Sequence, residues 1–165
     1  MPEELTDRPD LLQVAEALRE RFGDPVGAVT FEKGELAVRV RASELPAAVE
    51  FLKIVRGFNA LNDMIGLDRH PAPGEGRKRF SILYQLYRFP GRLRVRLVID
   101  IDEGEAVPSI VPLFKSAGWA EREIFDMFGI VFAGHPDLRR VYLPDEFEGF
   151  PLRKDFPLEG KTRAD

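Results

Sequence analysis

The segment FSILYQLYRFPGRLRVRLVIDI, residues 80–101, decides the fold of this chain. Apolar and polar residues alternate on both sides of Pro90-Gly91, and a period of two is typical of strands with one buried face. Proline followed by glycine marks a turn. The segment therefore predicts a β-hairpin. Its buried residues are predicted to be Phe80, Ile82, Tyr84, Leu86, Leu93, Val95, Leu97, Ile99 and Ile101.

The residues before this hairpin predict two helices and three further strands. Helical spacing of apolar residues indicates a helix over 9–22, and Ser43 begins a second one that runs to about residue 55. Between them, an alternating pattern predicts a hairpin that turns at Lys33-Gly34. The apolar run 60–68 predicts a strand, and residues 70–79 read as a loop.

The residues after the central hairpin predict two helical segments and then irregular chain. Ser109 is expected to begin a short helical segment, which Ala117-Gly118 interrupts, and residues 119–128 form a further helix that Gly129 ends. The predicted class is α+β: a mostly antiparallel mixed sheet with helices packed on it, followed by an extended irregular C-terminal tail. We expect an α+β domain over 1–130 and a tail over 131–165 that binds a partner.

Composition excludes several classes of function. The chain has 165 residues, a formal net charge of -4 and no cysteine. Without cysteine there is no disulfide, thiolate metal site or conventional iron–sulfur ligation. A mildly acidic total disfavours non-specific binding to nucleic acid or to anionic membranes. No G-x-G-x-x-G fingerprint is present, so nicotinamide binding is not indicated. Neither His70 nor His135 has a second ligand at a spacing typical of metal sites, so we expect no cofactor and no metal in this chain.

The densest cluster of charges lies in WAEREIFDMFGI, residues 119–130. Arg122 and Asp126 are four residues apart and are predicted to pair on one helix face. A stand-alone enzyme that uses His135 with Glu121 or Glu123 for acid–base chemistry is one interpretation. The chain offers no nucleophile, metal or oxyanion hole to complete such a site, so we predict no catalytic residue.

A basic strip on the central hairpin gives a second interpretation. Arg92, Arg94 and Arg96 lie in RLRVR. They form either a solvated strand face or an RNA-binding strip. The outer face lacks the paired aromatic residues on which single-strand binders stack bases. We therefore expect no nucleic-acid partner.

The end of the chain carries apolar anchors between prolines and charges. In GFPLRKDFPL, residues 149–158, Phe150 and Phe156 flank the charged run Arg153-Lys154-Asp155. Proline excludes a regular helix, and a disordered tail would be poorer in aromatic residues. The tail either folds back over its own domain or binds another protein as a strap. Apolar anchors interleaved with charges favour the interface.

Two segments together resemble a known family. EREIFDMFGIVFAGHPDLRRV, residues 121–141, closely resembles the motif of the thirty-kilodalton subunit of respiratory complex I, the C subunit of its peripheral arm. GFPLRKDFPL resembles the ending of the same family. The similarity extends from about residue 58 to residue 158.

The resemblance implies a non-catalytic structural subunit of a proton-translocating NADH:quinone oxidoreductase. The chain would support the quinone-reducing module from the cytoplasmic side of the cell membrane, and would be peripheral. The resemblance implies as partners other complex I subunits, especially the D subunit of the quinone site and the iron–sulfur subunits B and I. NADH, FMN, iron–sulfur clusters and quinone would belong to those neighbours. The equivalent subunit of a related energy-converting membrane-bound hydrogenase is the alternative.

We predict that the interface with these partners lies on the charged helix and the tail, where Arg139, Arg140 and Arg153 would pair with partner carboxylates. The predicted interface residues are Glu121, Arg122, Glu123, Asp126, His135, Asp137, Arg139, Arg140, Phe150, Arg153, Lys154, Asp155 and Phe156.

Overall fold

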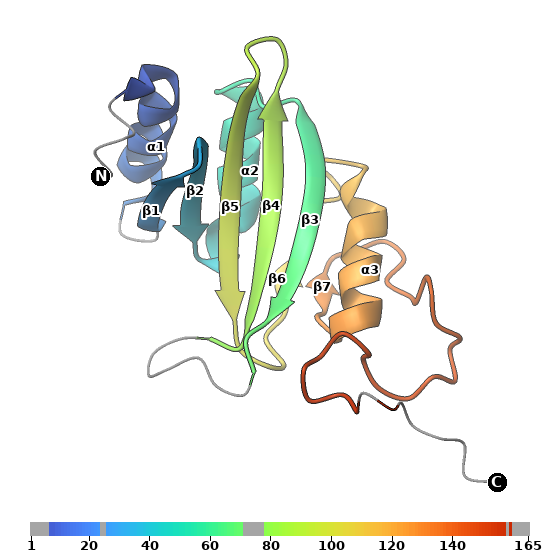
Figure 1. Ribbon diagram of the computed structural model, residues 1–165. Coiled ribbons are helices and arrows are strands. Elements are labelled where there is room, and N and C mark those ends of the chain that lie inside the picture. The colour runs from blue at the N-terminus through green and yellow to red at the C-terminus, as the bar shows by residue number, and fades with distance from the viewer. Residues whose placement is uncertain (1–6, 24–25, 71–77, 158, 160–165) are drawn as a thin grey trace, which may run out of the picture.

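The computed structural model describes residues 7–23, 26–70, 78–157 and 159. Three helices pack on a five-stranded sheet, and a small two-stranded sheet lies beside them (Figure 1). The helices are α1 (Pro9–Phe22), α2 (Leu45–Ile54) and α3 (Ala117–Phe128). The strands are β1 (Val26–Glu32), β2 (Glu35–Val40), β3 (Ala60–Asp68), β4 (Phe80–Arg88), β5 (Leu93–Ile101), β6 (Val107–Pro108) and β7 (Phe132–Ala133).

The main sheet has the strand order β1-β2-β5-β4-β3. The pairs β1–β2, β4–β5 and β3–β4 are antiparallel, and β2 pairs with β5 in parallel. The predicted class, a mostly antiparallel mixed sheet with helices on it, is therefore confirmed. The central hairpin occupies β4 and β5, and the strand predicted at 60–68 is β3.

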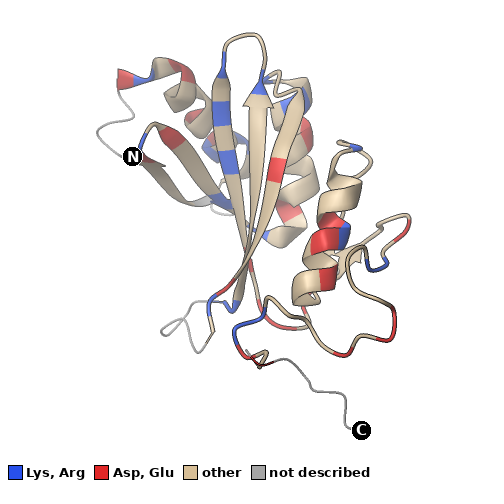
Figure 2. Ribbon diagram, turned by 45° about the vertical axis from the view of Figure 1, so that its right-hand side comes forward, with Lys and Arg blue, Asp and Glu red and all other residues tan. Residues whose placement is uncertain are grey.

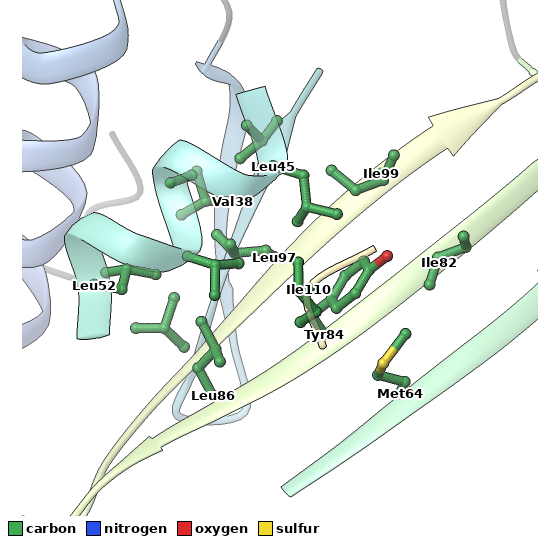
Figure 3. Packing of buried hydrophobic residues seen from close by; sticks show 14 of the residues in the cluster. Val38, Leu45, Leu52, Met64, Ile82, Tyr84, Leu86, Leu97, Ile99 and Ile110 are labelled. Atoms are coloured by element: carbon green, nitrogen blue, oxygen red, sulfur yellow. The ribbon is translucent and has the colours of Figure 1, made fainter. Parts of the chain in front are cut away.

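All three helices bury side chains against one face of the sheet. Leu45 and Leu52 of α2 face Leu97 and Ile99 of β5 in this layer, with Tyr84 of β4 beside Ile110 (Figure 3). The nine residues predicted to be buried by the central hairpin all belong to this core. Alternation thus identifies the covered face correctly, because the helices supply the apolar layer that the strands require.

The region before α3 differs from its prediction. Residues 109–116 contain turns and no helix, and α3 begins at Ala117, two residues before the predicted start. Ala117 and Gly118 form the first turn of the helix, so they do not interrupt it. Lys53 holds the turn region by donating a hydrogen bond to the carbonyl of Leu113.

The tail begins inside the folded domain. β7 pairs with β6 in parallel, and the N–H groups of Val107 and Ser109 donate to the carbonyls of Val131 and Ala133, each at 2.9 Å. Beyond β7, the described residues of the tail contain turns but no helix or strand. Figure 1 shows this part winding around the lower half of α3. Whether the tail acts as a unit separate from residues 1–130 stays a prediction.

Candidate partner interface

Helix α3 approaches the sheet closely because β3 has a glycine at the contact. A Cβ atom on Gly66 would lie 2.8 Å from Cε2 of Phe128 and 3.4 Å from Cγ2 of Ile124. Ile124 and Phe128 are both buried. The apolar stripe of α3 is thereby fixed against β3, and the opposite side of the helix is turned toward the tail and solvent.

Asp126, on α3, is fully buried and organises the tail. Its Oδ2 atom accepts hydrogen bonds from the N–H groups of Val141, Tyr142 and Leu143, at 3.0, 2.8 and 3.1 Å. Its Oδ1 atom lies 2.7 Å from Nη1 of Arg140. One carboxylate therefore orders three consecutive peptide groups, as a buried anion requires several donors.

Arg140 extends this arrangement to the end of the tail. Its guanidinium donates to the carbonyls of Asp126, Phe147 and Gly149, at 3.2, 3.0 and 3.1 Å. The Arg140 side chain is only 14% exposed. We call Asp126 and Arg140 the buried hub, because α3 and two distant parts of the tail meet there.

The hub holds Asp126 in its charged form. Burial by itself raises the pKa of this carboxyl, but the N–H group of Tyr142, the guanidinium of Arg140 and the N–H groups of Val141 and Leu143 outweigh it. The net result is a pKa below the usual range. The ion pair is therefore present at neutral pH.

The predicted pairing of Arg122 with Asp126 is wrong. Arg122 donates to the carbonyls of Arg139 and Arg140, at 3.1 and 3.0 Å. Asp126 is buried under the tail, and tail donors occupy both of its oxygens. Helical spacing alone could not show that residues fourteen or more positions later would compete for the same carboxylate.

His135 fastens the start of the tail to the start of α3. Its Nδ1 atom accepts a hydrogen bond from the N–H group of Asp137 at 3.0 Å. An accepting Nδ1 requires the proton on Nε2, which lies 3.0 Å from the carbonyl oxygen of Gly118 and donates to it. Both ring nitrogens therefore bind the backbone.

A second anchor holds the tail against the lower end of the sheet. Arg79, just before β4, contacts three carboxylates: Asp68 at 3.1 Å, Glu103 at 2.6 Å and Asp155 at 2.8 Å. Glu103 also pairs with Arg153 of the tail at 2.5 Å. We call these five residues the tail clamp, since they join β3, β4, the chain after β5 and the tail.

Asp68 is the buried member of the tail clamp. It also accepts hydrogen bonds from the N–H groups of His70 and Lys154, each at 3.0 Å. Burial raises the pKa of Asp68, but the Arg79 guanidinium and these two N–H groups outweigh it and lower the pKa to about 2. Asp68 is therefore ionised throughout the physiological range.

Phe150 and Arg153 pack over the end of α3. Gly129 ends the helix in the left-handed conformation, with φ of 73°, and a Cβ atom there would lie 2.5 Å from Cε2 of Phe150. The Nε atom of Arg153 donates to the carbonyl of Phe128 at 2.6 Å. The Arg153 guanidinium lies 4.6 Å from the centroid of the Phe150 ring. The glycine thus makes room for the tail as well as ending the helix.

With the tail in place, α3 presents a surface rich in aromatic and charged side chains. Trp119 and Tyr142 are 55% and 60% exposed, and their rings meet edge to face with centroids 6.2 Å apart. Arg122 lies over the Trp119 ring at 5.6 Å, and the Tyr142 hydroxyl donates to Glu123 at 3.4 Å. We call these four residues the α3–tail surface. Tryptophan, tyrosine and arginine are the residues most enriched at interface hot spots.

Glu121 points the other way, into the core. Its Oε1 atom accepts a hydrogen bond from the N–H group of Ile110 at 2.8 Å, while Oε2 is buried without a hydrogen-bond partner among the described residues. The buried hydroxyl of Tyr84 also has no hydrogen-bond partner among the described residues. Burial raises the pKa of Glu121, and the nearby Ser109 side chain, the N–H group of Ile110 and His135 offset this only in part.

Replacing Glu121 with glutamine should therefore remove a pH-dependent destabilisation of the folded state. The raised pKa means that the folded state binds the proton more tightly than the unfolded state, so wild-type stability falls as pH rises from about 4.5 through the folded-state pKa. We expect Glu121→Gln to be close to wild type at pH 4.5 and more stable by about 1 kcal/mol at pH 8. Urea unfolding followed by Trp119 fluorescence measures both values. Glu123→Gln, two residues away and exposed, is the matched control and should keep the wild-type dependence of stability on pH. The same dependence on pH in Glu121→Gln and in wild type would contradict the prediction.

The predicted interface residues fall into three groups by burial in the structure. Glu121 and Asp126 are fully buried, and Arg140 and Arg153 direct their hydrogen bonds to the chain itself. In the predicted partner interface these four residues would act indirectly, by fixing the shape of the tail. The exposed members are Glu123, Asp137, Arg139, Lys154 and Asp155; the half-buried members are Arg122, His135, Arg140, Phe150, Arg153 and Phe156.

Sequence reasoning missed four residues that shape this region. Trp119 and Tyr142 are exposed, and aromatic residues in an amphipathic segment are normally assigned to the core. Asp68 and Arg79 are separated by a loop, and nothing in their spacing indicates that they meet. Two arginines of the basic strip on β5 have partners within the chain. Arg96 pairs with Glu35, and Arg94 lies over the Tyr87 ring at 6.0 Å.

In the described part of the chain, no group of three or more His, Asp or Glu residues could hold a metal ion. Among the helices described above, none is long and apolar enough to cross a membrane.

The fold of this chain is similar to those of two solved structures. The fold is similar to the trypsin-resistant fragment (1-134) of Nqo5, with a TM-score of 0.68 and 32% identity over 78% of this chain and 99% of that one. It is also similar, at 19% identity and a TM-score of 0.72, to a chain of the membrane-bound sulfane sulfur reductase, an archaeal respiratory membrane complex, covering 93% of this chain and 94% of that one. Both solved structures therefore share the fold of this chain.

The family follows from the sequence match. The model described as "Respiratory-chain NADH dehydrogenase, 30 Kd subunit" matches residues 38–162. An NADH-quinone oxidoreductase C subunit of Rhizobium etli (strain CIAT 652), the one designated C 2, is 42% identical over 148 residues, which cover 87% of this chain and 75% of that protein. The chain belongs to the thirty-kilodalton subunit family of respiratory complex I, as its sequence motifs indicate.

Proposed function

We propose that this chain is a structural component of the peripheral arm of a proton-translocating NADH:quinone oxidoreductase. It supports the quinone-reducing module on the cytoplasmic side of the cell membrane, and catalysis takes place in neighbouring subunits. The partners are the D subunit of the quinone site and the iron–sulfur subunits B and I. NADH, FMN, iron–sulfur clusters and quinone are held by other subunits of the complex.

The observation that carries this proposal is the α3–tail surface. Trp119 and Tyr142 are large, rigid and mostly exposed, although they pack against each other. Exposing such side chains to water is unfavourable unless a partner covers them. Arg122 and Glu123 surround them with charges of both signs, as in the polar rim of an interface. The buried hub and the tail clamp fix the backbone beneath, so this surface is organised before a partner binds.

The second support is the way that the buried polar groups are used. Asp126, Asp68 and His135 all direct their side chains to backbone or to paired cations. Groups committed to such contacts hold a shape, whereas a catalytic group needs a face free for substrate. The site therefore fits a role in assembly.

Removing the two exposed aromatic side chains tests the proposal. We expect Trp119→Ala with Tyr142→Ala to reduce the recovery of partner subunits with the tagged chain at least tenfold, because hot-spot truncations each cost about 2 kcal/mol or more. Recovery is measured by affinity purification from membranes and quantitative mass spectrometry. The stability of the isolated chain should change by less than about 1 kcal/mol, since both side chains are exposed.

Phe89→Ala is the matched control. Phe89 is 63% exposed, similar to Trp119 and Tyr142, but lies at the turn between β4 and β5, away from α3 (Figure 1). This variant should retain the partners. Wild-type recovery by the Trp119/Tyr142 double variant would overturn the assignment of this surface.

The same purification separates the two related complexes. Recovered material that oxidises NADH with quinone as acceptor identifies complex I. Activity with a different electron donor, and none with NADH, would point to the related energy-converting complex.

A further inference from the structure

The face of the sheet opposite the helices is uncovered in its middle. In Figure 1, α2 lies behind β5 and β4, and no other described element lies in front of these strands. On this open face, Ile65 of β3, Leu83 of β4 and Val98 of β5 are in register, since Ile65 pairs with Leu83 and Leu83 with Val98. They form one apolar row across three neighbouring strands, which we call the open-face row.

The open-face row departs from the pattern of a solvated face. An antiparallel sheet that meets water on one side normally alternates apolar-in with polar-out. Here the alternation breaks at the same level in three strands, so apolar residues occupy both faces. Leu83 is half-buried and Val98 is 7% exposed, so the exposed apolar surface of this face lies on β3, where Ile65 is 36% exposed and its neighbour on the same face, Leu67, is 41% exposed. Apolar side chains aligned in this way across strands indicate a surface that is covered in the working protein.

The open face is also hollow beside this row. A cavity of about 180 Å³ extends across the sheet, and small residues, Ala28 and Ala37, form one side of it. Leu67, Leu83 and Val98 form the other side. A concave, partly apolar surface fits a protruding segment of another protein better than it fits a broad flat surface such as a membrane.

The charged residues that line the hollow itself are all basic. Arg39, Arg69 and Arg96 line it, and no acidic residue of the described chain does. Arg39 and Arg96 have carboxylate partners beside the hollow, in Asp100 and Glu35. Arg69 is the least neutralised, because its contact with Asp100 is 3.9 Å and its Nε atom donates to the uncharged hydroxyl of Ser81. Figure 2 marks the basic positions of β5 in blue.

We propose that the open face is a second docking surface, for a segment of a neighbouring protein of the complex that carries apolar residues flanked by Asp or Glu; this rests on the proposed function. The apolar residues cover the open-face row, and the carboxylates meet Arg69, Arg39 and Arg96. Arginine's planar fork suits bidentate contacts with carboxylates. A second copy of this chain is a poor occupant, because it would bring the same three arginines to the same place and like charges repel.

The absence of cysteine allows a direct test. In the chain with Leu67→Cys, the introduced thiol is the only one of this chain, so maleimide label found on this chain after the subunits are separated reports on this position alone. We expect the thiol to react at least tenfold more slowly in the complex purified from membranes than in the isolated full-length chain. Glu20→Cys, on the exposed side of α1, is the reference for reactivity in the isolated chain.

The outcomes separate this inference from the proposed function. Equal reactivity of Leu67→Cys in the complex and in the isolated chain overturns the docking surface and leaves the proposed function standing. A tagged chain that recovers no partner overturns both.

Cross-linking identifies the occupant. With a photoreactive maleimide on Leu67→Cys, we expect a peptide of another protein of the complex that contains both apolar and acidic residues. A second copy of this chain, a lipid, or a peptide without acidic residues would each overturn the proposal.

Two substitutions give an independent readout. Leu67→Glu places a negative charge where a carboxylate-bearing segment would bind, and should lower partner recovery at least fivefold. Leu67→Met keeps an apolar side chain and should recover partners as wild type does. Thermal melting of the isolated chains shows whether Leu67→Glu folds; if it does not, the labelling experiment decides. A folded Leu67→Glu variant with wild-type recovery would contradict the inference.

Discussion

Asp126→Ala should lower the free energy of unfolding by about 3–5 kcal/mol, the cost expected when one member of a buried ion pair is removed. Arg140 would remain largely buried without its carboxylate, and the N–H groups of Val141, Tyr142 and Leu143 would lose their acceptor. A loss of this size is a large fraction of the roughly 5–15 kcal/mol that stabilises a domain. Urea unfolding of the isolated chain at pH 7 measures it.

Two control variants define what the carboxylate contributes. Asp137→Ala removes an exposed acid of the same tail, which pairs with Arg139 on the surface, and should change stability by less than about 0.5 kcal/mol. Asp126→Asn keeps one oxygen acceptor but loses the charge, so we expect an intermediate loss. If Asp126→Ala and Asp137→Ala had equal stability, the hub would not be holding the tail.

Gly129→Ala should lower the free energy of unfolding by about 2–4 kcal/mol, for two reasons that add. A residue with a side chain at φ of 73° is strained, by about 1 kcal/mol or more. The new Cβ atom would also lie 2.5 Å from Phe150 and 2.8 Å from Nη2 of Arg153, and overpacking costs about 1–3 kcal/mol. Limited proteolysis should cut the tail of this variant faster than that of wild type.

Gly134→Ala separates strain from displacement of the tail. Gly134 has φ of 81°, close to that of Gly129, but nothing in the described chain lies within 4 Å of its added Cβ atom. It should therefore lose only the strain energy and keep its tail protected. Equal losses in the two alanine variants would show that the contact of Gly129 with Phe150 and Arg153 contributes nothing.

Asp126→Ala and Gly129→Ala should also lower the recovery of partner subunits, although both act through the position of the tail. The α3–tail surface combines Trp119 of the helix with Tyr142 of the tail, and these lie together only while the hub holds. Loss of recovery in Asp126→Ala with Trp119 and Tyr142 intact would show that the partner recognises their arrangement.

The secondary structure can largely be predicted from local patterns. Alternation in residues 80–101 identifies β4, β5 and their buried face, and Gly129 correctly marks the end of α3. The prediction fails at residues 109–116, where a helical start signal at Ser109 is not followed by helix. There the N–H group of Ile110 bonds to Glu121, so a contact with α3 replaces the local preference.

The arrangement of the candidate interface can be predicted only in part. Local patterns point to the charged helix and the tail, but they pair Arg122 with Asp126 and give no signal for an exposed Trp119 and Tyr142. Local spacing shows which residues of one helix or strand can contact each other. It does not show whether a residue from another part of the chain will bind the same group instead.

The sequence by itself determined the family, the three α-helices, the five strands of the main sheet and the side of that sheet that is covered, because periodicity and motif spacing depend on neighbouring residues. Only the tertiary structure decided which charged side chains pair, as Asp126 does with Arg140 and Asp68 with Arg79. It also decided that Glu121 is buried in the core. Each of these depends on distance in space and on exclusion of water. The strength of a charge interaction is set by those two quantities and not by separation along the chain.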